Sequence, residues 1–169
     1  TRQKIACREV GFGSRVIRLT GIAKGAGMIQ PNMATMLCFI GCDAKVRQDT
    51  LQDMLRAAAD LSLNRITVDS DTSTNDAVVL MASGRSGVDL DQDFEAQAEF
   101  QDALTDLMVE LAHGLVRDGE GATKFVTVQV AGAETEAQAL EIAFSVANSP
   151  LMKTALFASD ANWGRLAMA

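Results

Sequence analysis

The sequence predicts a mixed fold of the α/β (α+β) class, and three observations support this prediction. Short apolar or alternating segments, separated by glycine, are typical of strands. Longer segments place apolar residues on one face of a helix. The two kinds of segment alternate along the chain, as in domains that pack helices against sheets. The 169 residues, 48% of them apolar, suffice for one structural domain with its own core.

The first half of the chain begins with predicted strands. Residues 1–23 read as strand-like pieces, and residues 24–35 form a turn segment marked by glycine and proline. The apolar run over 36–40 predicts a buried strand. A helix is expected over 49–63 because its apolar residues share one face, and a short strand is expected over 65–68.

A polar tract, residues 69–76, comes next and is followed by an apolar stretch over 77–82. Residues 93–115 carry the longest helical pattern, and residues 118–121 form a turn. Strict alternation over 125–130 predicts another strand. Two further helices are expected, over 134–147 and 151–158, and the last residues, 163–169, read like the start of another apolar element.

The composition argues against several classes of partner. A formal net charge of −7 disfavours nucleic acid, whose binding depends on Lys and Arg at phosphates. The same charge disfavours an anionic membrane surface. No apolar run reaches the roughly 18 residues of a membrane span, and no secretory signal is visible. We therefore expect a cytoplasmic enzyme or binding domain.

Neither a disulfide framework nor a metal site is expected. The three cysteines contain no Cys-x-x-Cys pair, and Cys38 lies in an apolar run, where it acts as a small core residue. The one histidine, His113, has no cysteine nearby. The polar tract alternates somewhat like a calcium loop, but Thr74 stands where that loop needs glycine and Leu80 where it needs glutamate. A hydrogen-bonded turn that supports a site is the favoured interpretation.

Chemistry is concentrated in residues 24–37, KGAGMIQPNMATML. The glycines let backbone approach a ligand closely, and the small Ala34 precedes Thr35 at the start of the buried strand. A threonine hydroxyl inside a chain is a poor nucleophile, whereas at a chain start its own α-amine, with a pKa of about 8, can act as the base. Attack of the Thr35 hydroxyl on the Ala34 carbonyl would create such a start. Taken alone, the pattern favours a capped turn.

Three further segments accompany the first: ITVDSDTSTND over 66–76, VRDGEGATKF over 116–125 and DANWGR over 160–165. All four, in this order, resemble segments of the ornithine acetyltransferases, also called glutamate N-acetyltransferases, of arginine biosynthesis. The resemblance covers nearly the whole chain. It implies layered sheets flanked by helices, of the N-terminal-nucleophile type.

By this resemblance, the precursor cleaves itself at the Ala34–Thr35 bond. Residues 1–34 are then the C-terminal tail of an α chain and residues 35–169 the N-terminal part of a β chain. Thr35 carries the acetyl group from N-acetylornithine to glutamate in a ping-pong reaction. Two α and two β chains are expected to form a heterotetramer.

The resemblance also assigns substrate-binding residues. Lys24 suits the α-carboxylate shared by both amino-acid substrates, and Glu120 suits a substrate ammonium. Without the resemblance, both residues read as ordinary surface or turn residues. No cofactor and no metal are implied. Some family members also use acetyl-CoA to acetylate glutamate, and the residues leave open whether this chain belongs to such a member.

The chain departs from the family pattern at several points. Ser70 stands where glycine is usual, which costs about 1 kcal/mol or more if that position has a positive φ. Leu63 replaces a usual phenylalanine. The family's oxyanion hole uses a Thr-Gly pair from an earlier region, and further substrate contacts come from a later one. Because neither region is present, we expect the 169-residue chain alone to be inactive.

Two alternatives to the acetyltransferase stay open. A related N-terminal-nucleophile aminopeptidase or amidase would pass the acyl group to water. A non-catalytic fragment that packs in an assembly belongs to a different class. Cleavage between Ala34 and Thr35, abolished by Thr35→Ala, separates an autoprocessing enzyme from such a fragment.

Overall fold

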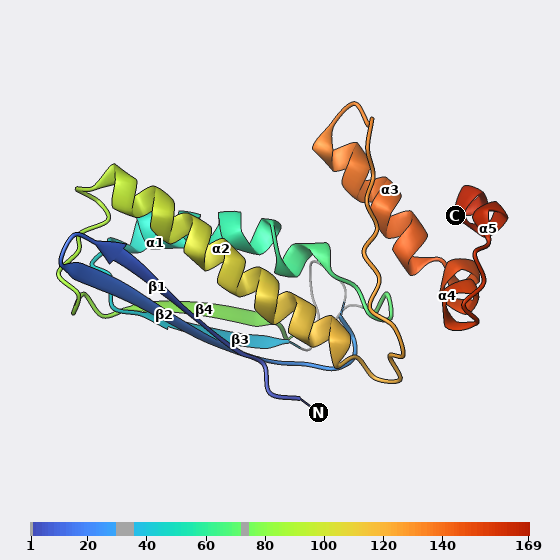
Figure 1. Ribbon diagram of the computed structural model, residues 1–169, viewed down its shortest axis with the longest axis horizontal. Coiled ribbons are helices and arrows are strands. Elements are labelled where there is room, and N and C mark those ends of the chain that lie inside the picture. Colours follow the sequence, from blue (N-terminus) through green and yellow to red (C-terminus); the bar gives the residue numbers. More distant parts are fainter. Residues whose placement is uncertain (1, 30–35, 72–74) are drawn as a thin grey trace.

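The computed structural model describes residues 2–29, 36–71 and 75–169. A four-stranded sheet carries two long helices on one face, and the last part of the chain is a series of three helices that extends away from the sheet (Figure 1). The strands are β1 (Ile5–Phe12), β2 (Arg15–Lys24), β3 (Leu37–Cys42) and β4 (Ala77–Ala82). They lie side by side in chain order. The predicted mixed class is confirmed.

The strand directions follow from the connections. β1 and β2 form an antiparallel hairpin, and β2 and β3 are also antiparallel. β3 and β4 are parallel, and the connection between them contains helix α1 (Gln48–Asp60) and a short 3-10 turn, η1 (Leu63–Arg65). A helix is the usual crossover between parallel strands.

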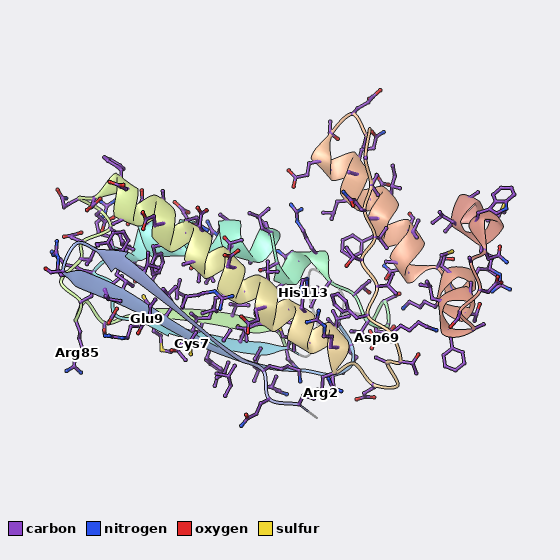
Figure 2. All side chains as sticks on the ribbon, viewed as in Figure 1. Arg2, Cys7, Glu9, Asp69, Arg85 and His113 are labelled. Carbon is purple, nitrogen blue, oxygen red and sulfur yellow. The ribbon has the colours of Figure 1, made fainter. Side chains whose placement is uncertain are left out.

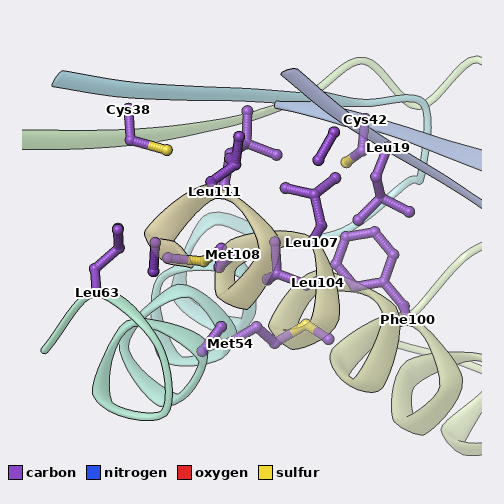
Figure 3. Packing of buried hydrophobic residues seen from close by; sticks show 14 of the residues in the cluster. Leu19, Cys38, Cys42, Met54, Leu63, Phe100, Leu104, Leu107, Met108 and Leu111 are labelled. Carbon is purple, nitrogen blue, oxygen red and sulfur yellow. The ribbon is translucent and has the colours of Figure 1, made fainter. Parts of the chain in front are cut away.

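Helix α2 (Phe94–Arg117) lies along the sheet and contributes a continuous row of side chains to the core (Figure 3). Its start is capped by Asp93, whose carboxylate accepts a hydrogen bond from the Ala96 amide. The predicted apolar face is confirmed. Its fully or almost fully buried side chains are those of Phe100, Leu104, Leu107, Met108, Leu111 and Leu115.

Close packing of α2 on the sheet depends on Gly21. A Cβ at this position of β2 would lie 2.7 Å from Leu107 Cδ2 and 2.9 Å from Leu111 Cδ1. Cys38 of β3 is fully buried in the same core, and burial raises the pKa of its thiol to about 11. Cys38 is therefore a core residue, as predicted, and all three cysteines are free.

The opposite face of the sheet is not covered by any element of the described ranges. It carries exposed apolar side chains from all four strands, which are Ile5, Ile22, Phe39, Val79 and Met81. The alternation in each strand therefore separates a helix-covered face from an open face.

The strand predicted over 65–68 is wrong. Residues 63–65 form η1 instead, and Ile66 turns its side chain into the core. The Val68 amide donates to the Ile29 carbonyl, 2.8 Å away, in the loop after β2. The segment thus binds that loop and takes no place in the sheet.

The strand predicted over 125–130 is also wrong. These residues have no strand partner within the described chain, and a ladder needs a second backbone for its amides and carbonyls. Three helices follow. The first two agree with the predicted helices, and the third lies where only the start of an apolar element was expected. They are α3 (Glu136–Asn148), α4 (Pro150–Phe157) and α5 (Trp163–Met168), and each begins after a side-chain cap. No helix in the described ranges is long and apolar enough to cross a membrane.

Candidate functional site

The loop that leaves β2 and returns to β3 carries the predicted site. Lys24, the last residue of β2, lies opposite Leu37, the first residue of β3. The exposed Lys24 is therefore at the end of the sheet where the chain enters β3, two residues after position 35. Ala34 and Thr35 lie outside the described residues.

The turn after α2 brings Glu120 to this loop. The Glu120 amide donates to the Ala26 carbonyl at 2.7 Å. A Cβ on Gly27 would lie 3.4 Å from Glu120 Oε1, so the loop passes directly beside the carboxylate. Lys24 and Glu120, far apart in sequence, thus belong to two segments that contact each other.

A third segment, the beginning of the polar tract, joins them. The Asp69 carboxylate accepts hydrogen bonds from the amides of Met28, at 2.6 Å, and Ile29, at 3.1 Å. It also accepts one from Asp71 within the tract, at 3.2 Å. Asp69 lies near the C-terminal end of α2 (Figure 2), and the turn that carries Glu120 follows this end of the helix. It shapes the loop by binding its backbone.

Positive φ angles accompany this contact. Met28 has a φ of 53° and Ser70 a φ of 69°. Such angles are costly for residues with a Cβ and persist where surrounding bonds enforce them. Ser70 thus has the positive φ on which the cost expected for serine at this position depends.

The end of the polar tract contacts the start of β3. The Asp76 carboxylate accepts a hydrogen bond from the Met36 amide at 2.6 Å, and the Ala77 amide donates to the Met36 carbonyl at 3.1 Å. Desolvation raises the pKa of Asp76 above its usual range, and the bond from Met36 opposes that rise. The tract was expected to form a hydrogen-bonded turn. Its two described ends accept hydrogen bonds from backbone amides, through Asp69 and Asp76.

A buried ion pair fastens the turn that carries Glu120. Lys4 Nζ lies 2.5 Å from Asp118 Oδ2, with 2% and 10% of the two side chains exposed. The Arg2 amide donates to the same carboxylate at 3.0 Å. Mainly the bond from Lys4 lowers the pKa of Asp118. The start of β1 is thereby attached to the end of α2.

Four residues that shape the site were not predicted: Lys4, Asp69, Asp76 and Asp118. The polar tract drew attention as a whole, but nothing in its pattern says which carboxylates bind which amides. Lys4 reads as an ordinary charge near the beginning of a strand. Asp118 lies in the expected turn at 118–121 and in the VRDGEGATKF segment, but neither signal points to a pair with Lys4.

A cavity of about 940 Å³ lies between the C-terminal half of α2, residues 121–130 and α3. Its lining is mainly apolar, and Glu120 is the one predicted substrate residue among the described ones that takes part. His113 lies in its wall with its ring 5.0 Å from that of Phe125. Burial and the nearby Arg117 lower the pKa of His113, which favours a neutral, packed imidazole. No cluster of potential metal ligands occurs among residues 2–29, 36–71 and 75–169.

Comparison with solved structures defines the class of the protein. The chain superposes on the arginine biosynthesis bifunctional protein ArgJ from Bacillus halodurans with a TM-score of 0.71 and 44% identity, covering 75% of this chain and 60% of that one. The fold is therefore of the N-terminal-nucleophile class. A family comparison matches residues 1–169 to the ArgJ family, and the chain belongs to that family.

Curated relatives agree. Proteins named arginine biosynthesis bifunctional protein ArgJ from Pseudomonas syringae pv. tomato and Ruegeria pomeroyi are each 52% identical to this chain. The matches cover 98% and 100% of this chain, but only 42% and 40% of the relatives. The chain thus spans about two fifths of their length. The resemblance found in the four sequence segments is confirmed.

Proposed function

We propose that this chain is the central part of an acetyltransferase of arginine biosynthesis and contains its self-cleavage site. The enzyme transfers an acetyl group from N-acetylornithine to glutamate. The observation that carries the proposal is the meeting of three segments at one end of the sheet: Lys24 at the end of β2, the loop beside Glu120, and the start of β3 after Thr35.

The first step is cleavage. The Thr35 hydroxyl oxygen attacks the Ala34 carbonyl carbon, the Ala34–Thr35 amide bond breaks, and the Thr35 nitrogen takes up the hydroxyl proton as it becomes a free amine. Water then hydrolyses the ester. Residues 1–34 end the α chain and residues 35–169 begin the β chain. Two α and two β chains form the assembly, which acts in the cytoplasm.

The second step is acetyl transfer. The Thr35 amine removes the hydroxyl proton as the oxygen attacks the acetyl carbonyl of N-acetylornithine, and ornithine leaves with that proton. The amine of glutamate then attacks the acetyl-Thr35 ester and restores the hydroxyl. Lys24 binds the substrate α-carboxylate, and Glu120 binds a substrate ammonium.

The lengths of the relatives support cleavage. Three quarters of this chain correspond to 60% of the solved Bacillus halodurans chain, whereas nearly all of it corresponds to only 42% of the Pseudomonas protein. The solved chain is therefore much shorter than a complete curated relative. A precursor divided into two chains has this property.

An assay of the full-length precursor tests the function. Incubation with N-acetylornithine and labelled glutamate is expected to release ornithine and N-acetylglutamate in equal amounts, and the Thr35→Ala precursor is expected to form neither. Release of acetate with no N-acetylglutamate would favour the hydrolase alternative. The word bifunctional in the relatives' names supports acetyl-CoA as a second donor, which the same assay tests by replacing N-acetylornithine.

A further inference from the structure

We infer that Asp69 and Asp76 form a two-point clamp, which holds the chain on both sides of the Ala34–Thr35 bond, and that both act as positioning residues. The inference rests on the proposed function, because it assigns a role in cleavage and acetyl transfer. It assigns that role to residues that do not contact the substrate.

The first anchor is at Ile29, six residues before Thr35. Asp69 Oδ1 accepts a hydrogen bond from the Ile29 amide at 3.1 Å, and the Val68 amide donates one to the Ile29 carbonyl at 2.8 Å. Both backbone groups of Ile29 are therefore bound by neighbouring residues of one segment. The Ile29 side chain is only 2% exposed, so the anchor is set in the core.

The second anchor, at Met36, repeats this arrangement. Asp76 Oδ1 accepts a hydrogen bond from the Met36 amide at 2.6 Å, and the Ala77 amide donates one to the Met36 carbonyl at 3.1 Å. Met36 is also buried, with 7% of its surface exposed. The Met36 nitrogen is covalently bonded to the carbonyl carbon of Thr35. Asp76 thus binds the peptide unit adjoining the nucleophile.

The two anchors are separated by the same number of residues in both segments that they join. Six residues, 30–35, separate Ile29 from Met36, and six residues, 70–75, separate Asp69 from Asp76. Hydrogen bonds to an ionised carboxylate are stronger than those between neutral groups. A charged clamp at each end of the cleavage segment limits the geometries that the segment can adopt, and correct orientation of reacting groups is a large part of rate enhancement.

Cleavage changes the roles of the two anchors. Before it, both anchors lie in the same chain as the Ala34–Thr35 bond, one on each side of it. After it, only the Asp76 anchor stays in the same chain as Thr35, because Ile29 then belongs to the other chain. Asp69 therefore serves mainly cleavage, whereas Asp76 serves cleavage and acetyl transfer.

The test uses the full-length precursor with Asp69→Ala, Asp76→Ala and Asp76→Asn. The cleaved fraction is followed over time by mass spectrometry, and kcat and KM are measured on the cleaved enzyme. We expect both alanine variants to slow cleavage by about tenfold or more, and Asp76→Ala alone to lower kcat by a similar factor with little change in KM. Asp76→Asn keeps an acceptor oxygen and is expected to recover part of both rates.

Two variants control for general destabilisation. Asp71→Ala removes a neighbouring exposed carboxylate of the same tract, and Ile17→Val weakens the core at the far end of β2. Both are expected to cleave at the wild-type rate, even where Ile17→Val lowers the melting temperature as much as the Asp76 variants do. Wild-type rates in Asp69→Ala and Asp76→Ala would overturn the clamp. A wild-type precursor that stays uncut would instead overturn the proposed function.

Discussion

The ammonium of Lys4 lies 2.5 Å from the carboxylate of Asp118, 114 residues further along the chain. The contact joins the residue before β1 to the residue that follows α2. Glu120 lies two residues after Asp118, and its amide donates to the Ala26 carbonyl. The ion pair therefore helps to hold the turn that carries a proposed substrate residue.

Replacing Lys4 tests that link. Lys4→Met keeps most of the apolar stem but leaves the Asp118 carboxylate without its closest cation, and removal of one partner of an enclosed pair is destabilising. We expect a lower melting temperature and, in the parent enzyme, a higher KM for N-acetylornithine. The exposed pair of Arg18 and Glu9 provides a control, because Arg18→Met is expected to change neither quantity appreciably. Equal effects of the two substitutions would contradict the link.

The same ion pair predicts a dependence of stability on pH. The pKa of Asp118 is lowered in the folded protein, first by the bond from Lys4, so the folded state favours the ionised form. The stabilisation is fully present above the unfolded pKa of about 3.9 and is lost as pH falls through the lower folded value. Chemical denaturation at a series of pH values should show this loss. Below about pH 4, the free energy of unfolding is expected to fall less steeply with pH in Lys4→Met than in the wild type. An unchanged slope would mean that other carboxylates cause the loss of stability.

Ser70 is expected to be a site of removable strain. Its φ of 69° is unfavourable for serine and permitted for glycine. Ser70→Gly should therefore raise the free energy of unfolding by about 1 kcal/mol, measured by urea denaturation. Asp71→Gly, next to it and outside the positive-φ region, is expected to lower stability slightly. A loss of stability in Ser70→Gly would show that the serine side chain has a compensating role.

Gly21 and Gly41 provide a matched pair in neighbouring strands. A Cβ on Gly21 would overlap Leu107 and Leu111, whereas a Cβ on Gly41 meets nothing within 4 Å. Gly21→Ala is expected to cost about 1–3 kcal/mol through overpacking. Gly41→Ala should be neutral or slightly stabilising. Similar free energies of unfolding for the two variants would contradict the described packing of α2 on β2.

Elements with a long or strongly apolar pattern could be predicted from the sequence. α2 and β3 were predicted within a few residues, because each buries a face that its residue spacing reveals. The alternation over 125–130 predicted a strand, yet alternation describes only side chains. A ladder also depends on a neighbouring backbone, which a local pattern does not specify.

The residues of the candidate site also fall into a group that the sequence could predict and a group that it could not. Lys24, Thr35 and Glu120 were assigned through the resemblance of whole motifs. The contacts of Asp69 and Asp76 depend on which amides the fold brings to their carboxylates, and sequence spacing carries no information about that. The Lys4–Asp118 pair spans most of the described chain and left no local signal either.

The central claim is tested most directly by mass spectrometry of the purified full-length precursor, with and without N-acetylornithine. The account predicts two chains, one of them beginning at Thr35, and a gain of one acetyl group on that residue when N-acetylornithine is added and glutamate is omitted. An active preparation with an uncut chain, a cut at another bond, or an acetyl group on a residue other than Thr35 would contradict it.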